Sequence, residues 1–514
     1  MHFRHHRHHS REKPKPIVSL PASSDRPLDL RERALLTVMA VHLVFLPWAL
    51  GTVHVWSQIV SLGFSVASFG LALSPRFGPE RYSGNLRFRL RNLPQLLRFP
   101  VFWLGMLFLL YILVQALNIA WVYISDGRSW WMEKVPSVKW LPTGMRTPFD
   151  QASPWRSLLI YSSAWLTVCA AWIGFARRKS LRLLLVVITT NAAGLALFGL
   201  LQRALGADRI FGFWKPPAAY FVASFIYRNH AGAYFGLLLA ACCGLAYWYH
   251  HRRLYRMEES SPAVVFAFFA MVVAMVILYS SSRGATLLMA LPVAVAMAVA
   301  GVELFTSPVA GQSRAVMAVF GALVLGFAAV GFSTLNTDGF AGHFKTFTSE
   351  IGNATENGHY IAPVATWEMA RDKLTTGWGA GSFSFYFPVY QVRHPAITVE
   401  HGLHLRWEHA HDDYLELLAE VGIIGCGLLA LGGLYYVAQL IRLRFWRQPL
   451  VILLLTGCLM TLLHATFDFP FFNPAVLITW CVFWPLMIRW LVFEQQLARA
   501  MPQTANKVAS NAAS

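Results

Sequence analysis

Runs of 17 to 21 mainly apolar residues recur along the chain, and they constrain its fold more than any other feature of the sequence. Because about 20 apolar residues span the hydrocarbon core of a bilayer as an α-helix, each run is a candidate membrane crossing. Of the 514 residues, 56% are hydrophobic and only 13% are charged, whereas soluble domains carry roughly 25% charged residues. The sequence therefore predicts an all-α, polytopic membrane protein with about 12 transmembrane helices.

The expected crossings are separated by short segments that are rich in arginine. They cover residues 34–50, 54–74, 101–121, 157–175, 181–201, 231–249, 263–281, 285–305, 315–335, 421–441, 450–467 and 474–493. The predicted organisation is a basic, His-rich cytoplasmic tail (1–33), crossings one to nine (34–335), one large periplasmic loop (336–420), crossings ten to twelve (421–493) and a cytoplasmic tail (494–514).

The distribution of positive charge predicts the orientation of the chain. Residues 1–33 carry eight Lys and Arg residues and 75–100 carry six, whereas the 85 residues of 336–420 carry only five. Because Lys and Arg are retained on the cytoplasmic side, both termini are expected inside and 336–420 outside. The net charge of +18 follows from this bias and from attraction to anionic lipid headgroups, so no nucleic-acid partner is expected.

The most specific motif is His411-Asp412, which is followed after nine residues by Gly422-Ile423-Ile424-Gly425. A helix is expected from Glu408 onward, which would place His411 and Gly422 on one face and Asp412 in the first turn. The pKa of a histidine side chain suits it to accept a proton from a sugar hydroxyl. The glycine pair Gly422 and Gly425 permits close helix packing. The alternative is an interfacial histidine that only hydrogen-bonds to its neighbours.

Three arginines are expected at outward edges of the membrane, where the positive-inside rule disfavours them: Arg203, Arg228 and Arg283. A guanidinium group matches the oxygens of a diphosphate in a bidentate manner, so these residues are candidates for binding one. The alternative is that they anchor the chain to lipid headgroups.

A histidine and a carboxylate leave the eleventh crossing together. His464 and Asp468 are four residues apart and are expected on one helical face, where the carboxylate can orient His464 or a substrate hydroxyl. A polar pair that satisfies itself is the alternative. The His and acidic residues of 408–413 would point to several faces of the expected helix, so no metal site is predicted there.

Together these motifs resemble those of the O-antigen ligase and O-antigen polymerase-like superfamily. Its members share a His followed by Asn, Ser or Gln, nine residues and Gly-x-x-Gly at the start of a late crossing. This chain has Asp412 at the position of the amide or hydroxyl residue. The segments GWGAGSFSFYFPVYQ, HATFDFPFFNPA, RNHAGAY and SSSRGA are also similar to the family, within roughly residues 200–500. An arginine common before the tryptophan of the large loop is absent from HYIAPVATW.

The resemblance implies a multi-pass glycosyltransferase of the bacterial inner membrane whose active site faces the periplasm. Its donor would be a glycan linked to undecaprenyl diphosphate and its acceptor a saccharide or lipid A core, with no cofactor. Carried over to this sequence, His411 would be the general base. Arg228 and Arg283 would hold the diphosphate, with Arg203 as a third candidate. Asp412, His464 and Asp468 would be supporting residues.

Several reactions remain open. Ligation to lipid A core is favoured over polymerisation of O-antigen or exopolysaccharide units, because the His and Gly signature is stronger in ligases; transfer to protein is a further possibility within the superfamily. Outside it, a polytopic saccharide transporter is the alternative. Such transporters commonly contain two related six-helix halves, and no such repeat is visible here.

Overall fold

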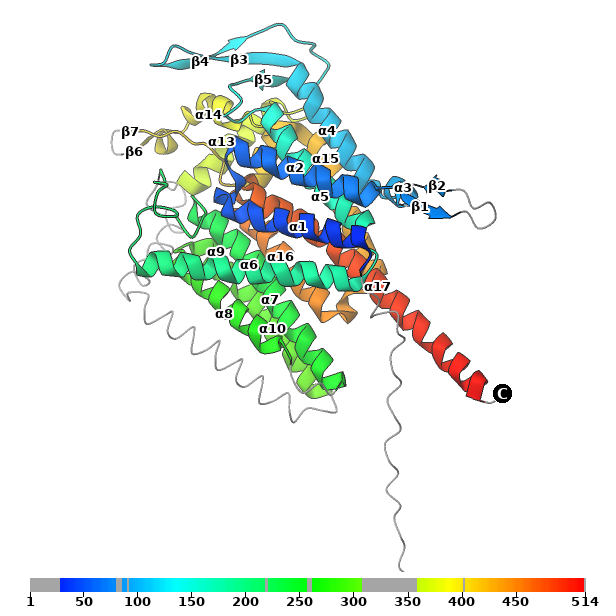
Figure 1. Cartoon of the computed structure of the whole chain (residues 1–514). Helices are drawn as coiled ribbons and strands as arrows, with labels where there is room; N and C mark the ends of the chain where they lie inside the picture. The colour runs from blue at the N-terminus through cyan, green and yellow to red at the C-terminus, as the bar shows by residue number, and fades with distance from the viewer. Residues whose placement is uncertain are drawn as a thin grey trace, which may run out of the picture.

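A computed structural model describes residues 28–79, 86–89, 92–217, 221–256, 261–306, 358–400 and 403–512. The predicted crossing at 315–335 lies outside these residues. Each of the other predicted crossings overlaps a helix (Figure 1). These helices are α1 (Leu30–Trp48), α2 (Val55–Leu73), α4 (Pro100–Leu117), α5 (Pro154–Gly174), α6 (Arg178–Ala204), α7 (Arg228–Arg256), α8 (Ala263–Tyr279), α10 (Ala290–Thr306), α15 (Asp413–Arg442), α16 (Pro449–His464) and α17 (Pro474–Ala512).

Among the described residues, 8 helical segments are long and apolar enough to cross a membrane. They are α2, α4, α5, α6, α7, α15, α17 and a segment in which the short helix α9 (Arg283–Leu288) continues into α10. The chain is therefore an all-α, polytopic membrane protein, as predicted. The predicted count of about 12 depends in addition on 315–335, on the shorter apolar helices α8 and α16, and on α1. Helix α17 continues to Ala512, through most of the segment predicted as a tail.

Proline residues mark where several of these helices begin. Pro100, Pro154, Pro449 and Pro474 are the first residues of α4, α5, α16 and α17. Proline lacks the N–H that has no intrahelical partner in the first turn, and its ring fixes a helical φ angle. These positions therefore help to set the ends of the membrane-embedded segments.

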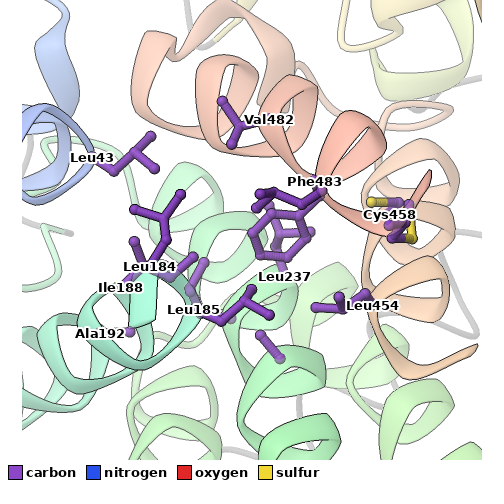
Figure 2. Packing of buried hydrophobic residues seen from close by; sticks show 14 of the residues in the cluster. Leu43, Leu184, Leu185, Ile188, Ala192, Leu237, Leu454, Cys458, Val482 and Phe483 are labelled. Atoms are coloured by element: carbon purple, nitrogen blue, oxygen red, sulfur yellow. The ribbon is translucent and has the colours of Figure 1, made fainter. Parts of the chain in front are cut away.

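Buried apolar side chains of α1, α6, α7, α16 and α17 form the central core (Figure 2). Leu185 of α6, Leu237 of α7 and Leu454 of α16 lie around Phe483 of α17. Helices in a membrane gain little from burying apolar surface against each other, so close approach through small residues matters more. One such approach joins α16 to α7, where a Cβ atom on Gly457 would lie 2.8 Å from that of Ala240.

Small elements cover both ends of α4. The segment between α4 and α5 forms a three-stranded sheet in the order β4-β3-β5. Its strands are β3 (Ile119–Ser125), β4 (Trp130–Lys134) and β5 (Gly144–Arg146). At the opposite end lie the hairpin β1 (Arg76–Pro79) and β2 (Leu86–Arg89) and the short helix α3 (Leu93–Leu97) (Figure 1). The described part of the large loop contains α13 (Gly358–Asp372), α14 (Phe383–Gln391), β6 (Val399–Glu400) and β7 (Leu403–His404).

Helix α15 is broken at Gly422, which has φ 63° and ψ −174°. The glycine-rich turn that follows α13, which contains Gly377, Gly379 and Gly381, enters this break. The backbone N–H of Gly379 donates to the carbonyl of Glu420 at 2.8 Å, and that of Ile423 donates to the carbonyl of Leu374 at 2.8 Å. The close approach at Gly422 is therefore made by a loop, rather than by the neighbouring helix that the sequence pattern suggested.

Two polar side chains of α4 complete the hydrogen bonding at this break. The hydroxyl of Tyr111 donates to the carbonyls of Thr376 and Val421 at 2.6 and 3.0 Å. The amide of Gln115 donates to the carbonyls of Thr376 and Glu420 at 3.1 and 3.2 Å. Interrupting a membrane helix exposes backbone polar groups that apolar surroundings cannot satisfy, so these side chains stabilise the break.

We predict that Gly422→Ala lowers the thermal unfolding midpoint of the detergent-solubilised protein. The Cβ atom would overlap the carbonyl oxygen of Thr375, and the backbone conformation is one that costs other residues about 1–3 kcal/mol. The matched control is Gly427→Ala on the same helix, because no atom lies within 4 Å of a Cβ there. Equal midpoints for both variants would contradict the constraint at Gly422.

Candidate functional site

The helix expected from Glu408 begins instead at Asp413, so the prediction that His411 and Gly422 share a helical face was wrong. The side chain of Asp412 caps the start of α15 by accepting hydrogen bonds from the N–H groups of Tyr414 and Leu415, both at 3.0 Å. Aspartate is among the residues that most favour this capping position. His411 precedes the cap in a left-handed conformation, with φ 55°. A non-glycine residue holds such a conformation only where its surroundings enforce it.

Glu416 of α15 holds the loop that carries His411. Its carboxylate accepts a hydrogen bond from the N–H of Ala410 at 2.6 Å and lies 3.0 Å from Nδ1 of His409. Burial lowers the pKa of His409 to about 4, although Glu408 and Asp468 favour its protonated form. His409 is therefore a structural neighbour of the site rather than an independent histidine on another helical face.

Asp468 lies between two imidazoles in the connection from α16 to α17. One of its carboxylate oxygens is 3.9 Å from Nδ1 of His411, and the other is 3.5 Å from Nε2 of His464. The predicted proximity of His464 and Asp468 is confirmed, although α16 ends at His464 and the aspartate follows in the connection. Burial alone would raise the pKa of Asp468, but His464, His230 and His411 together hold it below its ordinary value. The carboxylate is thus stabilised in its charged form.

The ring of Phe469 is the common contact of the aromatic side chains around this carboxylate. It stacks on His409 with ring centroids 4.4 Å apart and on Tyr227 at 5.1 Å. It meets His411 edge-on at 4.9 Å and His230 edge-on at 5.1 Å. His230 also places Nε2 3.2 Å from the carbonyl oxygen of Phe469. This packing fixes the orientation of the imidazoles that surround Asp468.

Arg228 is the first residue of α7 and lies beside this cluster. Burial and the charge of Asp468 raise the pKa of the neighbouring Tyr227, while the charge of Arg228 lowers it. Both charged groups are therefore near the same phenol. The segments that carry Arg228 and Arg283 also meet, because a Cβ atom on Gly232 of α7 would overlap that of Ala285 of α9.

Arg283 is the first residue of α9, which Ser282 caps by accepting a hydrogen bond from Ala285 at 3.4 Å. A Cβ atom on the next residue, Gly284, would lie 3.4 Å from Nε2 of His464. The start of α9 is therefore packed against the imidazole that contacts Asp468. Two of the three predicted arginines consequently belong to segments that border the site.

Arg203 is placed differently. It lies in the last turn of α6 with an exposed side chain, and the described ion pairs of Asp468 are with His411 and His464 rather than with Arg203. The described part of the chain therefore does not bring the third predicted arginine to this cluster.

Some residues of the site are not among those predicted from the sequence. Asp413 joins α15 to the α16–α17 connection, because its N–H donates to the carbonyl of Ala465 at 3.0 Å and its carboxylate accepts from the N–H of Phe471 at 3.0 Å. Together with Glu416 and Glu420, Asp413 forms a row of buried carboxyl groups on α15. Their i, i+3, i+7 spacing was the available signal, because acidic side chains on one face of an apolar helix need partners.

No group of three or more His, Cys, Asp and Glu side chains in the described residues is placed to hold a metal ion. The arrangement instead presents an imidazole beside a buried carboxylate, with two arginine-bearing helix ends next to it. Such a set can accept a proton and can stabilise negative charge nearby.

No curated protein matches this chain in sequence. Residues 266–430 match the model of a family that is described as O-antigen ligase. The matched region contains Arg283, His411, Gly422 and Gly425, whereas Arg228, His464 and Asp468 lie outside it. The resemblance inferred from the motifs is thus confirmed, and residues 266–430 of this membrane protein are similar to the O-antigen ligase family.

Proposed function

We propose that this protein transfers a glycan from undecaprenyl diphosphate to an acceptor saccharide, as an O-antigen ligase does. The observation that carries the proposal is the contact of His411 with Asp468. This pair lies beside the starts of α7 and α9, and His411 is within the residues that match the O-antigen ligase family. The donor is a membrane lipid, so the reacting groups belong at a membrane surface. The cluster lies at such an end of the transmembrane helices, because α7, α15 and α17 all begin there.

His411 is the general base of this reaction. Asp468 faces its Nδ1 atom, and Nε2 is the nitrogen that takes the proton from the acceptor hydroxyl in this proposal. The acceptor oxygen forms a bond to the anomeric carbon of the donor glycan as the bond from that carbon to the diphosphate oxygen breaks. The diphosphate remains on the carrier lipid with both electrons of the broken bond. Asp468 stabilises the imidazolium that His411 becomes.

Arg228 and Arg283 bind the diphosphate and stabilise the charge that it gains as it leaves. A guanidinium group donates parallel hydrogen bonds to phosphate oxygens, and a lysine lacks this geometry. Two cations from adjacent helices match the two phosphates of the leaving group. Polymerisation of O-antigen or exopolysaccharide units would use the same residues with a different acceptor, and the description of the matching family favours ligation.

The site faces the periplasm, with both termini in the cytoplasm. We predict that a cysteine at Lys139, which is exposed after β4, reacts with an impermeant thiol reagent in intact cells. A cysteine at Lys179, which is exposed at the start of α6, should react only after permeabilisation. The native cysteines in the described residues lie in helices, and the partly accessible Cys426 and Cys481 would first be replaced by serine. The opposite labelling pattern would place the site in the cytoplasm.

We predict that His411→Ala abolishes transfer while the protein still inserts and accumulates. Positioned general bases contribute about 10²–10⁴ in rate.

Asp468→Asn should reduce the rate at least ~10-fold, because an interaction with a charged partner is worth about 1.5–3 kcal/mol. In Asp468→Asn the imidazolium of His411 loses its negatively charged neighbour and is less stable, so the acidic limb of the pH–rate profile should move to lower pH. The assay uses purified protein, a lipid-diphosphate glycan, and lipid A core or a free glycan as acceptor.

The control for these variants is His251→Ala, near the opposite end of α7. His409→Ala is unsuitable, because His409 contacts Glu416 and Phe469 and its loss would disturb the loop. Full activity in His411→Ala would remove the base from this mechanism. An unchanged pH profile in Asp468→Asn, despite a lower rate, would assign Asp468 a structural role only.

We predict that Arg228→Ala and Arg283→Ala each lower turnover or donor affinity about 10-fold or more, and that lysine at either position restores activity only in part. Arg203→Ala is the matched control, since its exposed side chain makes no described contact with the cluster. Activity that survives both alanine changes would favour a lipid-anchoring role. A loss at Arg203 as large as at the other two would extend the donor site to the end of α6.

A further inference from the structure

Three arginines surround the indole of Trp248 at the end of the bundle opposite to His411. The guanidinium carbons of Arg178 and Arg182 on α6 lie 5.3 and 5.5 Å from the centre of this ring, and that of Arg252 on α7 lies 5.6 Å from it. Helix α7 begins at Arg228, beside the candidate active site. A helix rises 1.5 Å per residue, so Arg252 is about 36 Å farther along, a distance close to the thickness of a bilayer.

The acidic side chains near this arginine cluster are engaged in packing the helices together. Glu494 of α17 pairs with Arg178, which also lies 4.9 Å over the ring of Trp490. Glu32 of α1 accepts a hydrogen bond from the hydroxyl of Ser180 at 2.6 Å, and others from the N–H groups of Ala176 and Arg177 at 3.1 Å. Glu494 and Glu32 thus each join α6 to a neighbouring helix or to the turn before α6. Each guanidinium has five N–H donors, so one that already has a protein partner can still bind an anion.

The surroundings of the cluster are those of a membrane surface. Trp248 is partly exposed, and tryptophan and arginine are typical of the boundary between headgroups and hydrocarbon. The next residue, Tyr249, stacks on Phe266 of α8 with ring centroids 5.3 Å apart, so the start of α8 lies at the same level. Val264 and Val265 there are 70% and 49% exposed, which provides an apolar surface for acyl chains beside the positive charge.

We propose that Arg178, Arg182 and Arg252 form a binding site for the phosphate group of an anionic phospholipid, in the leaflet opposite to the glycan-transfer site. Basic pockets between transmembrane helices are suited to such headgroups, and a guanidinium binds phosphate oxygens in a bidentate manner. The site joins α6 to α7 and, through Arg178 and Glu494, to α17. It does not depend on the proposed role of His411.

The test compares lipid binding by the full-length protein purified in an uncharged detergent. Native mass spectrometry would measure the occupancy of cardiolipin, phosphatidylglycerol and phosphatidylcholine, each added at the same concentration. The unmodified protein should retain the two anionic lipids and little phosphatidylcholine. Arg182→Gln combined with Arg252→Gln should lower the occupancy of the anionic lipids at least ~10-fold, because charge-assisted hydrogen bonds are lost. Lys179→Gln is the matched control, as this exposed residue lies on α6 away from the three contacts with Trp248.

Two outcomes would overturn the proposal: equal lipid occupancy in the double variant and the unmodified protein, or an equal loss in Lys179→Gln. Inorganic phosphate and pyrophosphate form a separate arm, and displacement of the lipid by millimolar amounts of either would assign the site to a free phosphate. If the glutamine variant does not fold, the corresponding double lysine variant takes its place. Its occupancy should fall several-fold because lysine lacks the planar fork, and an unchanged value would overturn the proposal.

Discussion

The buried carboxylate of Asp468 must be held between His411 and His464, and the arrangement of three separate parts of the chain depends on that contact. A charged group away from water is stable only when several partners compensate for its lost hydration. The imidazoles provide that compensation, and the N–H of Phe469 adds a hydrogen bond at 2.8 Å. Asp413 then binds the start of α15 to the same connection through Ala465 and Phe471. The distance between His411 and Asp468 is therefore set by hydrogen bonds on both sides of the site.

The transmembrane architecture could be predicted from the sequence because it depends on the length of apolar segments, which is a local property. Prolines at the starts of α4 and α16 sharpen the same signal. The beginning of α15 was placed too early, although the side chain of Asp412 is itself a strong cap that favours a helix start at the next residue. A helix that began at Glu408 would have placed His411 on a helical face, whereas α15 begins at Asp413.

The contacts that assemble the site could not be predicted in the same way. His411 and Asp468 are separated by an entire helical hairpin, and no periodicity in the sequence relates them. The proximity of the segments that carry Arg228 and Arg283 depends on the packing of Gly232 against Ala285, which is a property of two helices together. Arg203 has the same local pattern as the other two arginines, a cation at a helix end, yet its side chain is exposed at the end of α6. The local sequence identifies all three arginines as candidates for binding a diphosphate, and only tertiary packing distinguishes Arg228 and Arg283 from Arg203.

The break at Gly422 also determines how this part of the chain can be exchanged with the corresponding part of a similar protein. Hydrogen bonds from Trp378 to Ala419 and from Ile423 to Leu374 cross the break in both directions, so the glycine-rich turn connects the two halves of α15. Residues 374–423, which include the loop of His411, should therefore be exchanged together. A chimera that exchanged only the large loop, with a boundary between α14 and α15, would combine a turn and a helix that were selected separately. Exchanges that keep these residues together are expected to preserve the position of His411.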